Sequence, residues 1–347
     1  MANDAGVRRS SMREVARAAG VSVSTVANVL SRPAIVAPET RRRVEQAIRH
    51  MGYVRHGPAR QLRGLPSPIV GSVILDLANP FFAELNRGIE DRLAEAGCLV
   101  LACSTDLQPA KERQVLDLLE EQAVRGVIIA PIGPDPAVLL EMSRRGTPVV
   151  LVDRPRDGLD LCAVGVDDVL GGRLAAEHLL SLGHRRIVYL GGTFETGTVI
   201  RRREGVRQAM RAAGLDPDDL LIDLRLPIHP PPLVEAAAAG VQQILAERPL
   251  PTAVLCLNDT AALGVLHGLG VAGVKVPQDI SVVGYDNLAF AAGLAPALTT
   301  VNQPKYQLGR AAADLLLDEA RPDHAHREIR FRPSLVIRAS TAPPRRA

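Results

Sequence analysis

Residues 11–32 read SMREVARAAGVSVSTVANVLSR, a pattern typical of two short helices separated by a glycine turn. Ser11 and Glu14 have the spacing of a capping box, in which each side chain bonds a free backbone N–H of the first turn. Gly20 suits the left-handed residue that ends a helix, and Ser22 can cap the next one. Apolar residues recur at helical spacing in both segments, at Val15, Ala16 and Ala19 and then at Val26, Val29 and Leu30. The stretch therefore predicts a helix-turn-helix unit, whose second helix enters the major groove of DNA.

The charge of the chain is concentrated around this helix pair. Residues 1–63 contain twelve arginines, no lysine and four acidic residues, a net charge of +8, whereas the whole chain carries +3. The alternative, an ordinary helical hairpin inside a larger core, does not account for that charge. A basic module is typical of nucleic-acid binding, because arginine bonds phosphates and guanine edges. We therefore expect double-stranded DNA as a partner.

A third helix and a linker follow the helix pair. Proline is favoured at the first helical position, so we expect a helix from Pro38 to about His50. Residues 53–68 are rich in proline and glycine and indicate a linker, with room for a short helix from Pro58 to Arg63.

Composition excludes several classes of protein. A chain of 347 residues with 47% hydrophobic residues is expected to form two or three packed domains. No run of about 18 apolar residues predicts a membrane span, and the polar N-terminus does not resemble a signal peptide, so we expect a cytoplasmic protein. The cysteines lack C-x-x-C spacing, and the closely spaced histidines, His324 and His326, lie in a charged loop. We expect no metal, no cofactor and no disulfide framework.

From residue 69 onward, short apolar runs alternate with amphipathic helical segments. The strand candidates are Ile69–Leu75, Leu99–Cys103, Gly126–Ala130, Val149–Val152, Ala163–Val166, Ile187–Leu190, Leu220–Asp223, Ala253–Leu257, Ile280–Tyr285 and Leu335–Ile337. The helix candidates are Phe82–Ala96, Ala110–Gln122, Gly171–Ser181, Ile200–Ala213, Val234–Glu247 and Ala261–Leu269. Such alternation predicts an α/β fold with parallel sheets covered by helices on both faces. There are too many strands for one compact sheet, so we expect two lobes with a ligand between them at the carboxyl ends of the strands.

The order of these parts resembles the LacI/GalR family of transcription regulators from about residue 11 to about residue 341. The matching segments are VAxxAGVS from Val15 with Thr25-Val26, Asn79-Pro-Phe-Phe, LVDRP at 151–155, LGHRRI at 182–187, Asn258-Asp259, ISVVGYDN at 280–287 and Leu298-Thr-Thr.

The resemblance implies a bilobed core like that of periplasmic binding proteins behind the three-helix DNA-binding domain. The expected parts are a helix-turn-helix domain over 1–54, a hinge over 55–67 and an effector-binding and dimerisation core over 68–343. Within the core, lobe 1 takes about 68–166 and 302–331, and lobe 2 takes about 167–301 and 332–343. The implied function is that of a transcriptional repressor, controlled allosterically by a small molecule that resembles a sugar.

The resemblance also assigns residues that contact DNA. Base contacts fall on Val23, Ser24 and Asn28, with Thr25 nearer the backbone, although Val23 also suits simple packing. Asparagine can bond the N6/N7 edge of adenine. The remaining expected contacts are Ser31, Arg60 and Leu62, of which Leu62 matches a leucine that family members insert into the minor groove. The family's usual Pro-Asn before that hinge helix is replaced here by Arg55-His56.

The effector residues that the resemblance assigns are Phe81, Phe82, Asp153, Asp167, Arg202, Asn258, Asp286 and Phe290. Carboxylates and amides bond hydroxyls, and a guanidinium grips a carboxylate, phosphate or diol. Arg201 and Arg203 leave the register of the arginine open by one residue. Asp286 and Asp167 have an alternative role as caps of the segments that follow them. The chain has no tryptophan, so Phe82 or Phe290 would supply any stacking surface.

Two other functions are compatible with a bilobed α/β core. A periplasmic-type binding protein would not need the basic N-terminal module. An α/β enzyme would need a catalytic motif, and the chain has no G-x-S-x-G, Walker or G-x-G-x-x-G sequence, so we expect no enzyme. We expect a homodimer on a pseudo-palindromic operator, with each helix pair reading one half-site. Little sequence follows the last strand candidate, which favours a dimer over a tetramer built with an added helix. The residues are compatible with an effector that releases DNA and with one that tightens binding.

Overall fold

The computed structural model describes residues 10–53, 67–133, 135–193, 196–227, 232–321 and 323–345. The chain divides into two compact units, Met1–Ser67 and Pro68–Ala347, each of which is described by itself. The residues expected to form the hinge, 55–67, lie outside the described residues except for Ser67, and so do Arg60 and Leu62.

The first unit is a small helical domain. Its elements are α1 (Met12–Ala19), α2 (Val23–Ser31), the 3-10 turn η1 (Pro33–Ile35) and α3 (Pro38–His50). The predicted capping box is present, since Ser11 Oγ accepts from the Glu14 N–H and the Glu14 side chain accepts from the Ser11 N–H. Gly20 ends α1 with a φ of +63°, a left-handed conformation that favours glycine. Val15, Val26 and Val44 are fully buried at the centre, so one small core holds the three helices together.

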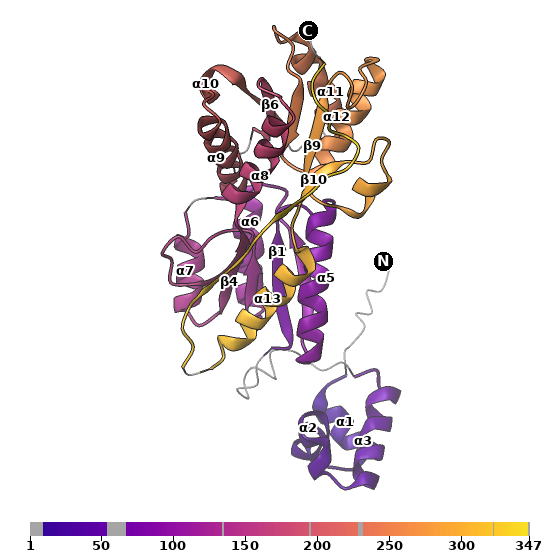
Figure 1. The fold of residues 1–347 in the computed structure, drawn as a ribbon. Coiled ribbons are helices and arrows are strands. Elements are labelled where there is room, and N and C mark those ends of the chain that lie inside the picture. Colours follow the sequence, from indigo (N-terminus) through magenta and orange to yellow (C-terminus); the bar gives the residue numbers. More distant parts are fainter. Residues whose placement is uncertain are drawn as a thin grey trace, which may run out of the picture. The chain divides into compact units, whose positions relative to one another are not determined.

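The second unit contains two six-stranded sheets (Figure 1). The first has the order β11-β5-β4-β3-β1-β2, and all its strands are parallel. The second has the order β12-β10-β9-β8-β6-β7 and is parallel except where β12 pairs antiparallel with β10. The strands are β1 (Ile69–Ile74), β2 (Leu99–Ser104), β3 (Val127–Ile129), β4 (Val149–Val152), β5 (Cys162–Val166), β6 (Ile187–Gly192), β7 (Leu221–Leu226), β8 (Ala253–Cys256), β9 (Ser281–Asp286), β10 (Thr299–Asn302), β11 (Glu328–Phe331) and β12 (Ser334–Val336).

Helices cover both faces of the first sheet. Leu85 of α5 and Leu308 of α13 belong to the core on one face, and Leu116 of α6 and Met142 of α7 belong to the core on the other. The helices of this unit are α5 (Pro80–Glu95), α6 (Pro109–Glu121), α7 (Ala137–Arg144), α8 (Asp168–Ser181), α9 (Gly197–Ala212), α10 (Pro217–Leu220), α11 (Leu233–Ala246), α12 (Asp259–Val271) and α13 (Lys305–Asp318), with the 3-10 turn η2 (Ala289–Gly293). Among the helices that the structure describes, none is both long and apolar enough to cross a membrane.

Neighbouring helices of this unit approach closely through glycines. A Cβ at Gly172 of α8 would lie 1.9 Å from the backbone oxygen of Arg202 in α9. In the same way, a Cβ at Gly205 of α9 would lie 2.0 Å from the backbone oxygen of Val169 in α8. Only glycine permits this approach at either position, so the α8–α9 crossing fixes where Arg202 lies.

The predicted fold class is confirmed: a three-helix unit precedes an α/β core with two largely parallel sheets. The sequence-based prediction did not include β10, β11, α7 or α13. Two of these elements, β10 and α13, follow one another in the segment that leads from the second sheet back to the first.

Candidate ligand cavity and DNA-binding helix pair

A cavity of about 360 Å³ lies between the two sheets of the core. It is bordered by residues that follow the carboxyl ends of strands in both sheets. Leu75 and Asp153 follow β1 and β4 of the first sheet, whereas Leu257 follows β8 and Asp286 ends β9 of the second. Carboxyl ends of parallel strands are where open α/β sheets bind ligands. The structure thus has a cavity at the position where the sequence predicted a ligand site.

Arg202 is the buried cation of this cavity. Its Nε lies 2.9 Å from Asp168 Oδ1, and its Nη1 donates to the Leu257 carbonyl oxygen at 3.0 Å. The guanidinium carbon lies 3.7 Å from the ring centre of Tyr285, a cation–π distance. The side chain is 9% exposed and Asp168 is 3% exposed, so this ion pair is shielded from water. These contacts hold the guanidinium in one orientation at the wall of the cavity.

Two carboxyl groups of the cavity sit on left-handed backbone. Asp153 has a φ of +57° and Asp286 a φ of +108°, conformations that persist only where surrounding contacts impose them. For Asp286 those contacts come from the Lys305 ammonium, 2.8 Å from its carbonyl oxygen, and from Gln303 Nε2, 2.6 Å from Oδ1. Burial raises the pKa of Asp286 to about 8 and, together with nearby Asp168, raises the pKa of Asp153 to about 7. Much of this pair is therefore protonated at neutral pH.

Two polar atoms at the cavity lack a hydrogen-bond partner among the described residues. They are Oε1 of Gln303, a residue only 1% exposed, and Oγ1 of Thr260. A buried polar group without a partner destabilises a fold unless a ligand or water satisfies it. Their position in the lining makes both atoms available to hydrogen-bond a ligand.

The cavity also has an apolar side. Phe81 and Phe82 at the start of α5 lie edge to face, with ring centroids 5.0 Å apart, and both line the cavity. Leu233 and Val234 at the start of α11 add aliphatic surface. A mixed lining of this kind suits a molecule with an apolar face and several polar groups.

Six of the eight predicted effector residues line the same cavity. They are Phe81, Phe82, Asp153, Arg202, Asn258 and Asp286. Of the three consecutive arginines, Arg202 lines this cavity, and Arg201 lines a neighbouring one. Asn258 lines the cavity while its Oδ1 caps α12, accepting from the Ala261 N–H at 2.8 Å.

The other two predicted effector residues lie elsewhere. Asp167 is the N-cap of α8, where Oδ1 accepts from the Leu170 N–H at 2.9 Å, because the chain turns into the helix at this point. The neighbouring Asp168 points inward to Arg202 instead. Phe290, in η2, packs against the core of the first sheet and is not among the described residues that line the cavity.

The sequence-based prediction did not include several residues that line the cavity, among them Thr198, Thr260 and Gln303. Thr260 directly follows the quoted Asn258-Asp259 pair, so its place next to a strand end was a usable signal. Gln303 comes from the segment after β10, for which no local pattern pointed to the cavity.

The predicted DNA-contact residues lie on the second helix of the small unit. Val23, Ser24 and Asn28 are exposed there, and Thr25 is partly buried beside the capping Ser22, 2.8 Å from hydroxyl to hydroxyl. Ser31 is partly buried, and its hydroxyl donates to the Ala27 carbonyl oxygen at 2.6 Å. The start of α2 therefore presents exposed side chains, of which Ser24 also hydrogen-bonds Ser22 at 2.7 Å, while the Ser31 hydroxyl is bonded within its own helix.

Comparison with known proteins identifies the family. A model described as "Bacterial regulatory proteins, lacI family" matches residues 11–56, and one described as "Periplasmic binding protein-like domain" matches residues 176–341. The HTH-type transcriptional regulator DegA of Bacillus subtilis is 34% identical over 343 residues, covering 96% of this chain and 99% of the relative. The chain belongs to the LacI family of bacterial regulatory proteins.

Other LacI-family members support the same assignment. The HTH-type transcriptional repressor PurR of Photobacterium profundum is 32% identical over 95% of this chain and 98% of its own length. A crystal structure of the lac repressor dimer bound to operator and the anti-inducer ONPF matches with a TM-score of 0.80, at 27% identity over 96% of this chain and 100% of that one. A LacI-family regulator from Enterococcus faecium with bound ribose matches with a TM-score of 0.73, at 33% identity over 79% of this chain and 99% of that one. This LacI-family chain is thus a helix-turn-helix transcriptional regulator.

Proposed function

We propose that this regulator is a homodimeric repressor of a pseudo-palindromic operator, controlled by a neutral, hydroxyl-rich molecule such as a sugar in the cavity of the core. Val23, Ser24 and Asn28 read bases in this account, and Thr25 contacts the DNA backbone. In this account the chain binds DNA and effector without catalysing a reaction, and it does so in the cytoplasm. The proposed domain limits are those expected from the sequence. The DNA-binding domain spans 1–54, the hinge spans 55–67, and the core that binds the effector and dimerises spans 68–343.

The polarity of the cavity carries this proposal. Arg202 is already paired with Asp168, so its positive charge is neutralised before a ligand arrives. Burial keeps much of the Asp153 and Asp286 pair protonated at neutral pH. Among the described residues, the lining adds the carboxylate of Asp76 but no unpaired cation, and with an acceptor at Gln303 and two phenyl rings it favours a neutral polyol over a phosphate or an acid. The ribose complex of the Enterococcus faecium relative is consistent with this class of ligand.

The similarity to the lac repressor supports a homodimer, because that protein's structure is a dimer bound to operator. Two copies of α2 would then read two half-sites related by symmetry. Effector binding between the lobes would change the population of lobe arrangements and through it the affinity for DNA.

The ligand class is tested by thermal shift and calorimetry on the full chain. We expect neutral sugars, ribose among them, to raise the melting temperature more than sugar phosphates, nucleosides or small acids do. Ala78→Trp places a large side chain in the lining from an exposed position and should abolish the shift. Its neighbour Leu77, which is exposed and outside the lining, gives the control Leu77→Trp. Stabilisation by charged ligands alone, or equal stabilisation of Ala78→Trp, would contradict the proposal.

A further inference from the structure

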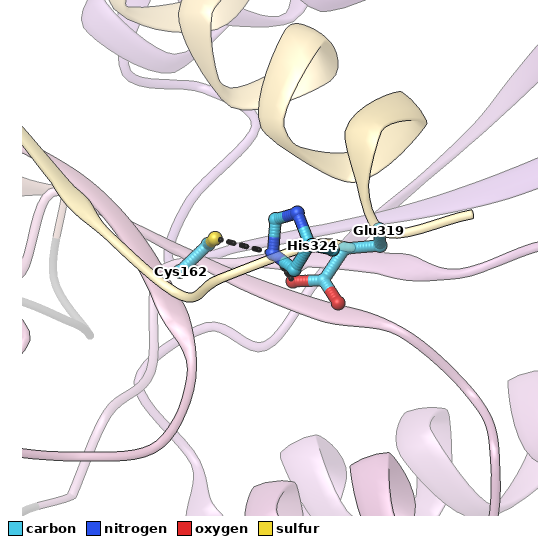
Figure 2. A group of neighbouring side chains, drawn as sticks. All are labelled: Cys162, Glu319 and His324. Carbon is cyan, nitrogen blue, oxygen red and sulfur yellow. Dashed lines mark hydrogen bonds and ion pairs between the residues drawn. The ribbon is translucent and has the colours of Figure 1, made fainter. Parts of the chain in front are cut away.

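A second group of chemistry-bearing side chains lies at the opposite end of the first sheet from the cavity. Cys162 is the first residue of β5, Glu319 follows the last residue of α13, and His324 lies in the segment between α13 and β11. Strands β5 and β11 are adjacent and parallel, so their amino ends bring Cys162 close to the segment that precedes β11. Figure 2 shows the three side chains converging on one point.

The distances within this group are those of ligands around a small cation. The Cys162 sulfur lies 3.3 Å from His324 Nε2, and the same nitrogen lies 3.2 Å from Glu319 Oε1. The sulfur, nitrogen and oxygen atoms all lie within 4.8 Å of one another. Zinc bonds to sulfur at about 2.3 Å and to nitrogen and oxygen at about 2.0–2.2 Å, so tetrahedral ligands around it stand about 3–4 Å apart. The sulfur–nitrogen and nitrogen–oxygen separations already lie in that range.

The group is buried, and its thiol and imidazole are hydrogen-bonded to each other. Cys162 is 0% exposed, and the His324 and Glu319 side chains are 7% and 10% exposed. Among the described residues, Glu319 Oε1 has no hydrogen bond and only a 3.2 Å contact with His324 Nε2, and His324 Nδ1 has no hydrogen bond and only a 3.4 Å contact with Asp318 Oδ2. A cation held between the thiol, the imidazole and the carboxylate would give Glu319 Oε1 the partner that it lacks.

The surroundings resemble the outer shell of a metal site. Asp318 Oδ2 lies 3.4 Å from His324 Nδ1, the ring nitrogen that faces away from the sulfur. Asp318 is held in turn by Arg321 at 3.0 Å and Arg327 at 3.1 Å. A carboxylate at the far nitrogen of a histidine fixes the ring orientation that metal binding requires. On the other side, His326 Nε2 lies 3.4 Å from Glu319 Oε2.

We propose that Cys162, Glu319 and His324 form a site for a divalent transition metal of the zinc class. A thiolate, an imidazole and a carboxylate suit zinc or cobalt(II) better than magnesium or calcium, which prefer oxygen ligands alone. Binding displaces the thiol proton to solvent and forms the metal–sulfur bond. The ion joins the start of β5 to the end of α13 and to the segment before β11.

Spacing along the chain predicted no metal here, because Cys162 lies far along the chain from Glu319 and His324 and only folding brings it to them. His326, the second of the two closely spaced histidines, lies beside the site, and its Nδ1 is 2.7 Å from Asp160 Oδ1.

Titration of the full chain with cobalt(II) tests this site. The protein is reduced, freed of any affinity tag and stripped with a chelator before titration. We expect one cobalt(II) per chain with the absorption of a thiolate–cobalt bond, and displacement of cobalt by zinc. Cys162→Ser should abolish the thiolate absorption, and His324→Gln should weaken binding by at least about 10-fold. Cys103→Ser, at a partly buried thiol in β2, is the matched control and should bind as the unaltered chain does.

Two results would overturn the proposal. One is the absence of thiolate–cobalt absorption in the unaltered, reduced chain. The other is equal binding by the unaltered chain, Cys162→Ser and His324→Gln, which would indicate adventitious surface binding. If Cys162→Ser does not fold, His324→Gln still decides, because it leaves the thiol in place. Sugar binding should be the same with and without metal, since the cavity lies at the other end of the sheet.

Discussion

At the scale of single residues, Asn28 gives the simplest test of the proposed DNA-reading surface. It is exposed on α2, and its amide can bond an adenine edge in two places. We expect Asn28→Ala to weaken binding to the preferred duplex by about 1–3 kcal/mol, roughly 5- to 150-fold. The measurement is fluorescence anisotropy with a duplex selected by the protein from a random pool.

Gln46 supplies the control for this substitution, because it is exposed on α3 of the same small unit. Gln46→Ala should leave affinity for the selected duplex within about 2-fold, and both variants should bind random DNA equally. Unchanged specific affinity in Asn28→Ala would remove Asn28 from the reading surface.

The buried carboxyl of Asp286 predicts how stability depends on pH. Burial raises its pKa to about 8, whereas in the unfolded chain the pKa is about 3.9. Unfolding therefore releases a proton between about pH 4 and pH 8. The contribution of Asp286 to stability is complete below pH 4 and is lost as the pH rises through 8. Burial raises the pKa of Asp153 and Asp259 as well, so they add to the same trend.

Asp286→Asn removes one of these titrations while keeping an oxygen for Gln303. Urea unfolding at several pH values should show a weaker loss of stability from pH 5 to pH 8 than in the unaltered chain. Asp117→Asn, at an exposed position on α6, should leave the slope unchanged. An identical slope for the Asp286 variant would mean that Asp286 is ionised in the folded protein.

At the scale of elements, the crossing of α8 and α9 sets the position of Arg202. Gly172→Ala would place a methyl group 1.9 Å from the backbone oxygen of Arg202, so the helices must separate. We expect a loss of at least about 1–3 kcal/mol in the free energy of unfolding, and weaker sugar binding because Arg202 moves with α9.

Gly270 gives the matched control within α12, since a Cβ there meets no atom within 4 Å. Gly270→Ala should be neutral or stabilising by about 0.5–1 kcal/mol, because alanine is the better helix former. Equal stability of the two variants, measured by urea unfolding, would show that the α8–α9 approach is looser than the structure indicates.

Elements with local signals were predictable, and the rest were not. The caps at Ser11 and Gly20 and the apolar helix faces are signals within short stretches of sequence. The sequence therefore predicted the helix pair almost to the residue. Strand β11 reads Glu-Ile-Arg-Phe and is an edge strand with partly exposed residues, so no apolar run marked it. Which of Asp167 and Asp168 meets Arg202 depends on helix packing, and the sequence alone did not distinguish them. The group formed by Cys162, Glu319 and His324 could be recognised only from the complete fold of the first sheet.

For the whole molecule, the uneven charge predicts strong salt dependence of DNA binding. The net charge of +8 over residues 1–63 lies on the part that carries α2. Each phosphate contact releases counterions, so affinity should fall about 10³-fold between 50 and 200 mM salt if six contacts form. Sugar binding in the cavity should not change over that range, because the ligand is neutral. DNA affinity that is almost independent of salt would contradict the assignment of the basic unit to phosphate contacts.

The central claim is that occupancy of the cavity sets affinity for DNA. The most direct measurement is the affinity of the full chain for its selected duplex with and without a saturating sugar found by thermal shift, for the unaltered chain and for Ala78→Trp. The account predicts a change of about 5-fold or more in the unaltered chain, in either direction, and no change in Ala78→Trp, which should bind the duplex as tightly as the sugar-free protein. A sugar that binds in the cavity and leaves the DNA affinity of the unaltered chain unchanged would contradict it.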